Sequence, residues 1–227
     1  MLYSSDQVTE ETRRFFHKVF FWMFVGLTLS SIVAVVVATN EMLANAIINS
    51  PFMILIFILQ IALVFGLVAL IERMSASVAT LLFLLYSFLT GLTLSVIFFL
   101  FTLESIGLTL GITAGMFGIM SIYGFTTDAD LTSMGKIMYM GLIGIILASI
   151  ANWFLQNSML DYITAFLGVI IFTGLTAYDI QKIKHSNKIG NEGSEEDHKE
   201  AIIGALRLYL DFINLFLSLL RLTGNRK

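Results

Sequence analysis

The chain has 227 residues, of which 57% are hydrophobic and none is cysteine, and its formal net charge is −3. A mean hydropathy of +0.88 implies more apolar surface than a soluble domain can bury. We therefore expect an all-α polytopic membrane protein forming a single domain over residues 1–227. The lack of cysteine excludes disulfides and thiolate metal sites, and the small net charge without a basic cluster argues against nucleic acid as a partner.

Apolar segments long enough to cross a bilayer recur seven times along the chain. The first is not a cleavable signal peptide, because residues 1–18 mix acids with bases and the apolar run that follows has full span length. Pro51 precedes the second segment, at a helix start where its missing N–H does no harm. The predicted spans are residues 19–38, 52–71, 78–101, 106–125, 137–155, 162–180 and 201–220.

Two spans carry small residues on one face. The fourth has glycines at 107, 111, 115 and 118, a ridge that is expected to let another helix approach closely. The third has a small and polar face made of Ser87, Thr90, Gly91 and Ser95. We interpret both faces first as packing surfaces.

Basic residues in the loops predict the orientation. Arg13, Arg14, Lys18, Arg73 and Lys136 fall on one side, together with four lysines in the polar loop Gln181–Glu200, whereas the three alternate inter-helix loops carry none. The N-terminus is therefore expected in the cytoplasm. The basic C-terminal tail would be exported by seven full crossings, which we favour over a re-entrant last helix. The loop Gln181–Glu200 itself is interpreted as a solvated connector.

A charged residue lies in the middle of the last span. Asp211 shares one helical stripe with Gly204, Arg207, Asn214, Ser218 and Arg221, at spacings of three and four. A charge at this depth costs about 2.5–3.5 kcal/mol on insertion scales, so such side chains usually face a protein interior or a water-filled path. The stripe is therefore the first place to look for function.

A second carboxylate, Asp179, closes the sixth span. The sixth and seventh spans run in opposite directions, so both aspartates are expected in the cytoplasmic half. Two carboxylates brought together at low dielectric cannot both ionise easily, and such a pair would share a proton and titrate as one unit. The pair could also contact a cation transiently, with water completing the coordination.

Structural alternatives stay open for these residues. Asp179 could be solvated at a helix end, and Asp211 could pair with Arg207 one turn away. Arg73, which ends the second span on the same side, could reach Asp179 and favour its ionised form. On physical grounds alone, we favour the alternative that it extends to lipid head groups and fixes the orientation of the helix.

Four stretches resemble the Bax inhibitor-1 family, also called the transmembrane Bax inhibitor motif family, in its bacterial inner-membrane branch. They are Tyr86-Ser-Phe-Leu-Thr-Gly-Leu-Thr-Leu-Ser95, Thr113-Ala-Gly-Met-Phe-Gly-Ile-Met-Ser-Ile-Tyr-Gly-Phe-Thr-Thr127, Gly174-Leu-Thr-Ala-Tyr-Asp-Ile-Gln-Lys182 and Leu208-Tyr-Leu-Asp-Phe-Ile-Asn-Leu-Phe216. The resemblance extends from the first span to the C-terminus, and the last two stretches together are its most specific part.

The resemblance implies a bundle of six helices around a central seventh, and a pH-sensitive calcium leak. It assigns Asp179 and Asp211 to the pH sensor and transient cation contact, and Arg73 to the residue that pairs with the sixth-helix aspartate in the closed form. Arg207 departs from the family, which is expected to have a small hydroxyl residue there. Its fixed positive charge would favour the ionised form of Asp211 and oppose cation entry. Arg207 and Asn214 are therefore candidate modulators.

Two other functions are alternatives to a pH-sensitive leak, whose partners would be calcium and protons. Intramembrane aspartyl proteases also place aspartates on their sixth and seventh helices, but they carry Gly-x-Gly-Asp where this chain has Leu208-Tyr-Leu-Asp211, and a Pro-Ala-Leu that is missing here. We therefore expect no enzymatic activity and no cofactor. The remaining alternative is a non-conducting regulator that binds other membrane proteins, such as a quality-control protease, through its glycine-rich face.

Overall fold

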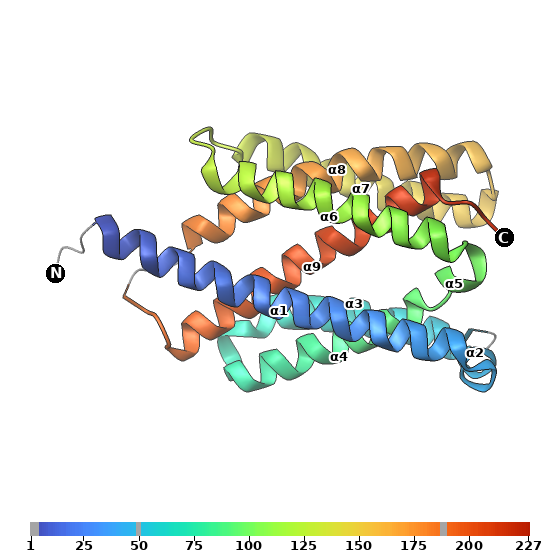
Figure 1. Ribbon diagram of the computed structural model, residues 1–227, viewed down its shortest axis with the longest axis horizontal. Coiled ribbons are helices and arrows are strands. Elements are labelled where there is room, and N and C mark those ends of the chain that lie inside the picture. Colours follow the sequence, from blue (N-terminus) through green and yellow to red (C-terminus); the bar gives the residue numbers. More distant parts are fainter. Residues whose placement is uncertain (1–4, 49–50, 187–189) are drawn as a thin grey trace. The chain divides into compact units, whose positions relative to one another are not determined.

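The structure is a computed structural model that describes residues 5–48, 51–186 and 190–227, and Figure 1 shows its helices. Seven helices are long and apolar enough to cross a membrane, which confirms the predicted fold class. The elements are α1 (Ser5–Thr39), α2 (Glu41–Ile48), α3 (Phe52–Leu70), η1 (Ile71–Arg73), α4 (Ala76–Leu94), α5 (Ile97–Leu100), α6 (Leu103–Thr126), α7 (Thr132–Leu155), α8 (Ser158–Ser186) and α9 (Glu195–Thr223).

Several helices extend beyond the predicted spans because polar sequence at their ends remains helical. The last span begins at Glu195 rather than 201, since Ser194 accepts a hydrogen bond from the Asp197 amide at 3.1 Å. Asp197 in turn accepts one from the Gly193 amide at 2.9 Å, which differs from a capping box in that the donor precedes Ser194 by one residue. Hydropathy alone could not locate this start, because the first turns of α9 are charged.

The third span, Ala76–Leu100, agrees with the prediction in extent but contains a break near its end. α4 stops at Leu94, and the Ser95 hydroxyl donates to the Leu92 carbonyl at 2.6 Å before the short α5 begins. A serine that bonds the backbone three residues earlier tightens the last turn and favours a bend at this point. The predicted small and polar face of this span is buried, as expected for a packing surface: Ser87, Thr90, Gly91 and Ser95.

The chain forms two compact units. Unit 1 comprises residues 1–100 and 186–209, and unit 2 comprises residues 101–185 and 210–227. The boundary falls within α9, whose first half belongs to unit 1 and whose second half belongs to unit 2. The predictions of a single domain and of a central seventh helix stay predictions. α9 is nevertheless the most buried of the seven long helices, with 67% of its apolar window buried.

Unit 1 is held together by close packing of α1 against α4. A Cβ on Gly91 would lie 2.7 Å from the Ser30 carbonyl oxygen, so only glycine allows the two backbones this approach. The Ser30 hydroxyl lies 2.7 Å from the Ser87 carbonyl oxygen and 2.6 Å from the Tyr209 hydroxyl. Hydroxyl and carbonyl groups from three helices therefore satisfy one another inside this unit.

The segment between α8 and α9 is tied to α1 rather than simply solvated. Lys18 donates to the buried Asp197 carboxylate at 2.6 Å, and Arg14 pairs with Glu192 at 3.0 Å. Glu11 accepts the Gly190 amide at 2.7 Å. The interpretation of the whole loop Gln181–Glu200 as a solvated connector is therefore wrong for residues 190–197, since charges on the first helix hold them.

Unit 2 contains α6, α7, α8 and the second half of α9. α6 and α8 meet where a Cβ on Gly124 would lie 2.9 Å from the backbone C and Cα atoms of Ala177. Lys184 then donates to the Phe125 carbonyl at 2.8 Å, which satisfies an acceptor at the C-terminal end of α6. The two contacts occur in the same order along both helices, so α6 and α8 run parallel.

The glycine ridge of α6 does not serve the purpose that its spacing predicts. A Cβ added at Gly107, Gly111, Gly115 or Gly118 would have no described atom within 4 Å. The expectation that another helix of this chain packs there is therefore wrong within the described residues. The close approach to α8 instead depends on Gly124, which lies outside the four-residue repeat.

Candidate functional site

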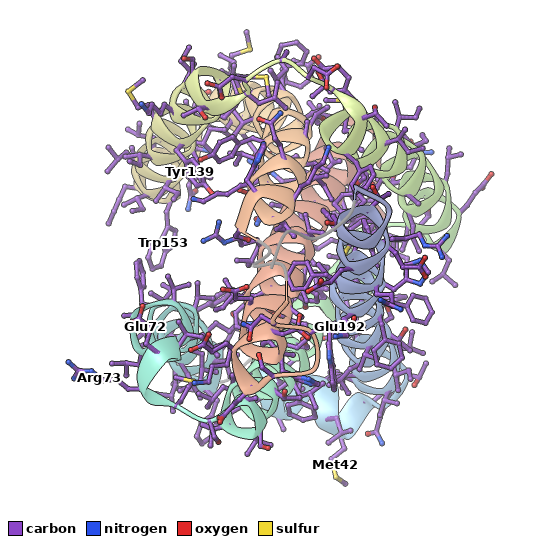
Figure 2. All side chains as sticks on the ribbon, turned by 90° about the vertical axis from the view of Figure 1, so that its left-hand side faces the viewer. Met42, Glu72, Arg73, Tyr139, Trp153 and Glu192 are labelled. Carbon is purple, nitrogen blue, oxygen red and sulfur yellow. The ribbon has the colours of Figure 1, made fainter. Side chains whose placement is uncertain are left out.

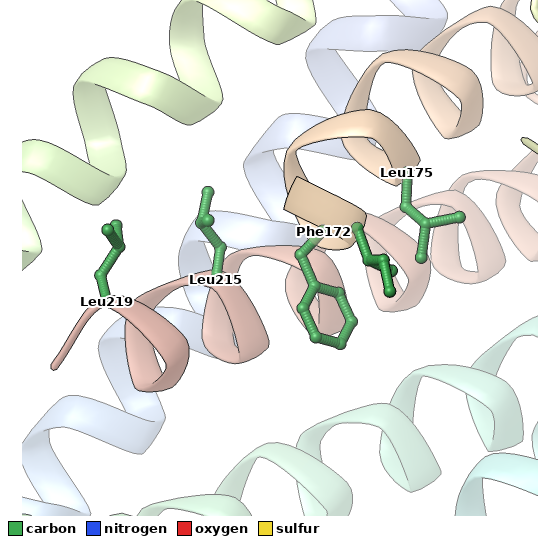
Figure 3. Close-up of a cluster of buried hydrophobic side chains, with 5 residues drawn as sticks. Phe172, Leu175, Leu215 and Leu219 are labelled. Carbon is green, nitrogen blue, oxygen red and sulfur yellow. The ribbon is translucent and has the colours of Figure 1, made fainter. Parts of the chain in front are cut away.

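The second half of α9 packs antiparallel to α8. A Cβ on Gly168 would lie 3.1 Å from the Ser218 Cβ. Further along α8, residues 171, 172 and 175 form a buried cluster with Leu215 and Leu219 (Figure 3). The facing stripes are therefore Gly168, Phe172 and Leu175 on α8, and Ser218 and Leu215 on α9.

An ion pair fixes the other end of this helix pair. Arg221 at the end of α9 pairs with Asp161 near the start of α8 and also donates to the Thr164 hydroxyl at 3.0 Å. Arg226 adds a second contact to Asp161 at 3.4 Å. The C-terminal end of α9 thus lies where α8 begins, which favours a full crossing over a re-entrant last helix.

Asp179 and Asp211 both lie on the continuation of the facing stripes. On α8, Asp179 follows Leu175 by four residues, and on α9, Asp211 precedes Leu215 by four, so each carboxylate shares the face of its neighbour. Both residues are buried, with 3% and 4% of their surface exposed. Both belong to unit 2.

The register of the two stripes gives an axial offset for the pair. Asp211 lies seven residues from Ser218, whereas Asp179 lies eleven residues from Gly168. At a rise of 1.5 Å per residue, continuing the stripes offsets the two Cα atoms by about 6 Å along the helix axes. An offset of one turn is within the range that two carboxylates and a bridging water can span.

A tyrosine that sequence reasoning missed contacts the Asp179 carboxylate. The Tyr139 hydroxyl on α7 donates to its two oxygens at 3.3 and 3.4 Å. Tyr139 is held in turn by an edge-to-face contact with Tyr178, whose centroid lies 6.0 Å away (Figure 2 labels Tyr139). Tyrosines near span ends are common in membrane proteins, so nothing in the sequence distinguishes this one.

The end of α8 beyond Asp179 fixes the loop between α6 and α7. The buried Gln181 side chain accepts the Leu131 amide at 2.9 Å and donates to the Ala129 carbonyl at 2.8 Å. A pocket of about 550 Å³ opens beside this loop, and its lining includes Asp128, Asp130, Tyr178, Gln181, Lys182 and His185. Tyr178 and Gln181 flank Asp179 in the sequence, so the pocket lies at the same end of unit 2 as that carboxylate.

The remaining predicted residues have the following positions. Arg73 ends η1 with an exposed side chain that extends away from its helix (Figure 2). Arg207 is half-buried, one turn before Asp211 on α9. The Asn214 amide donates to the Leu210 carbonyl at 2.8 Å, so its N–H group already has a partner in the helix backbone. The gating role of Arg73 and the modulating roles of Arg207 and Asn214 stay predictions.

The carboxylates do not form a conventional metal centre. Among residues 5–48, 51–186 and 190–227, no three His, Cys, Asp or Glu side chains gather in a way that could hold a metal ion. Two carboxylates supply at most four oxygens, fewer than the six to eight that calcium takes. Any cation contact at Asp179 and Asp211 would therefore be completed by water and by neutral oxygens.

Comparisons with known proteins cover nearly the whole chain. Residues 12–227 match the family described as inhibitor of apoptosis-promoting Bax1. The inner membrane protein YbhL of Escherichia coli K12 is 49% identical over 212 residues, 92% of this chain and 91% of that protein. A Borreliella burgdorferi protein is 46% identical over 215 residues, 94% and 93% of the two chains. A membrane protein of Streptococcus pyogenes serotype M1 is 35% identical over 214 residues, 93% and 92% of the two chains.

Proposed function

The chain belongs to the Bax inhibitor-1 family, and from that premise we propose that it is a pH-sensitive calcium leak gated by Asp179 and Asp211. The family assignment and the apolar helices make it a membrane protein. The observation that carries the proposal is that Asp179 and Asp211 are both buried, on α8 and α9. Each lies on the same helix face as residues of the cluster in which α8 and α9 pack against each other. No enzymatic step is part of it.

The chemistry of a shared proton supplies the gate. When the pair shares a proton, a hydrogen bond between the two carboxyl groups keeps the path closed. Pairing of Arg73 with Asp179 closes it in another way, because it neutralises the charge that would repel Asp211. When both are ionised, like charges at low dielectric repel and separate α8 from α9. The flux of calcium therefore rises with pH.

Access to the pair is supported by the pocket beside the loop of residues 127–132. Its lining carries both acids and bases, so it is polar and has no strong preference for one sign of charge. We propose that calcium and protons reach Asp179 through it. The basic residues in the loops support a cytoplasmic position for this end and for the N-terminus. The name of the Escherichia coli relative supports the bacterial inner membrane as the location.

The test is calcium flux in liposomes that contain the purified protein, measured from acid to neutral pH. The parent is expected to show a pH-dependent flux and Asp211→Asn a flux that does not change with pH. Glu104→Gln is the matched control, because it removes an exposed carboxylate from the first turn of α6. Identical flux curves for Asp211→Asn and the parent would exclude this mechanism.

A second candidate function is a non-conducting regulator of other membrane proteins. The observation that favours it is the row of glycines on α6 with no described atom within 4 Å. Small residues at four-residue spacing let a foreign helix pack closely in a bilayer. A protein that passes no calcium at any pH in the same liposomes would support this function over the leak.

A further inference from the structure

Two buried hydroxyl groups in unit 2 lack hydrogen-bond partners. Within the described part of the chain, neither Ser121 Oγ on α6 nor Thr173 Oγ1 on α8 has one. Ser121 is 8% exposed, and both hydroxyl oxygens are inaccessible to solvent from outside. Such groups are rare in folded proteins, and an internal water is their most common partner.

A hydroxyl on a helix normally has an easy alternative, which makes these two conspicuous. Thr113 donates to the Thr109 carbonyl at 2.8 Å, Thr176 to the Phe172 carbonyl at 2.8 Å and Thr90 to the Tyr86 carbonyl at 2.9 Å. Each bond needs only rotation of the side chain toward the preceding turn. Ser121 and Thr173 lie on the same helices as two of these residues and do not make it.

The two hydroxyls lie at the same level of parallel helices. The contact of Gly124 with the Ala177 backbone sets the register of α6 and α8. Ser121 precedes Gly124 by three residues and Thr173 precedes Ala177 by four, so both lie one turn before the contact and on the faces that meet there. At 1.5 Å per residue, their axial levels differ by only about 1.5 Å.

The third helix at this level is α9, close to Asp211. The rings of Phe117 on α6 and Phe212 on α9 are 5.5 Å apart, in an edge-to-face contact. Phe117 lies one turn before Ser121, and Phe212 directly follows Asp211. The α8–α9 register likewise places Leu175, two residues after Thr173, level with Asp211. The Asp211 carboxylate therefore belongs to the same layer as the two hydroxyls.

We propose that Ser121 and Thr173 bind an internal water in this layer, beside Asp211. The two hydroxyls and the carboxylate give the water the two to four polar partners that an ordered internal water requires. The same neutral oxygens supply ligands that two carboxylates lack for a hard cation. The role of this hydration site in calcium passage rests on the proposed leak function, but its occupancy by water does not.

The test uses water as the probe. Because the chain has no cysteine, any S–H signal comes from an introduced residue. Ser121→Cys and Thr173→Cys each introduce a single thiol whose S–H stretching band is unique in the infrared spectrum. Exchange of S–H to S–D is followed after transfer of the protein in liposomes to D₂O. Thr113→Cys is the matched control, because Thr113 is fully buried and its hydroxyl is satisfied by the helix backbone.

The site predicts that the thiols at 121 and 173 exchange about tenfold faster than the thiol at 113, since they contact water without unfolding. Thiols at 121 and 173 that exchange as slowly as the control would overturn the hydration site. A second arm measures calcium flux of Ser121→Ala and Thr173→Val, which keep both aspartates. Loss of about tenfold in flux is expected, equivalent to one lost ligand contact.

The two arms separate failure of this inference from failure of the proposed function. If the thiols of Ser121→Cys and Thr173→Cys exchange fast but the parent conducts no calcium, the water site is supported and the leak function is excluded. Fast exchange with flux unchanged in Ser121→Ala and Thr173→Val overturns the role of the site in calcium passage. Slow exchange together with a pH-dependent flux keeps the aspartate gate and removes the water site.

Discussion

Gly168 of α8 approaches Ser218 of α9 so closely that an added Cβ would lie 3.1 Å from the serine Cβ. This contact sets the antiparallel register of the two helices that carry the buried aspartates. Counting along both helices from it brings Asp211 level with Leu175, and Asp179 one turn, about 6 Å, beyond. The register, rather than any single hydrogen bond, is what relates the two carboxylates.

The contact between α6 and α8 predicts different effects for two glycine substitutions. Gly124→Ala should destabilise the protein by about 2 kcal/mol, because its methyl group would meet the Ala177 backbone, which cannot move aside like a flexible side chain. Gly111→Ala on the same helix meets no described atom within 4 Å and should leave the unfolding temperature unchanged or higher. Thermal unfolding in detergent checks both, and equal melting temperatures would contradict the packing described for unit 2.

The Tyr139 hydroxyl should tune the gate. It donates to the Asp179 carboxylate, and a donor stabilises the ionised form more than the protonated form. Tyr139→Phe removes that donor, so a higher pH is needed to ionise the pair and the midpoint of calcium flux should rise.

Tyr162→Phe is the matched control for this prediction, because Tyr162 on α8 is exposed and precedes Asp179 by more than four turns. Its flux midpoint should equal that of the parent. A midpoint that falls in Tyr139→Phe, or that moves equally in both variants, would show that Tyr139 does not stabilise the ionised pair.

The ion pair between Lys18 and Asp197 should govern the opening of the segment before α9. Asp197 accepts both the Lys18 ammonium and the Gly193 amide, so loss of Lys18 leaves a buried carboxylate with one donor fewer. Lys18→Gln should accelerate exchange of the Gly193 amide hydrogen about tenfold, measured by mass spectrometry. Arg13→Gln, which removes an exposed partner of Glu10, should leave that exchange unchanged.

The loop before α7 contains an aspartate whose titration should respond to one neighbour. Hydrogen bonds from the Thr132 side chain and then its backbone N–H lower the pKa of Asp130, which lies outside the predicted bilayer span. A lowered folded-state pKa stabilises the folded protein above the unfolded value, and that stabilisation is lost as pH falls through the folded value. Thr132→Ala should raise the pKa of Asp130 in an NMR titration, and an unchanged pKa would contradict this origin.

Hydropathy was sufficient to predict the number of membrane helices but not their ends. The seven spans are confirmed, since about twenty consecutive apolar residues have few structural alternatives. The extension of α9 back to Glu195 depends on two hydrogen bonds, from the Asp197 amide to the Ser194 hydroxyl and from the Gly193 amide to the Asp197 carboxylate. Such hydrogen bonds depend on one or two polar residues, and hydropathy averaged over a sequence window does not detect them.

Sequence periodicity predicted which residues of the candidate site share a face, but not which residues from other helices contact them. Asp211 and Ser218 do lie on one stripe of α9, and the spacing of three and four was enough to show it. Tyr139 comes from α7, and its contact with Asp179 follows from helix packing. The glycine ridge of α6 was recognised as a packing motif, but the motif does not specify which helix packs on it, and no described atom of this chain does.

Calcium flux across the pH range in Asp179→Asn, Asp211→Asn and the double variant tests the shared gate most directly. If the two carboxylates titrate as a unit, each single substitution abolishes the pH dependence and the double variant shows no further change. If either single variant retained the pH profile of the parent, or if the two effects simply added, the carboxylates would titrate independently and the account would fail.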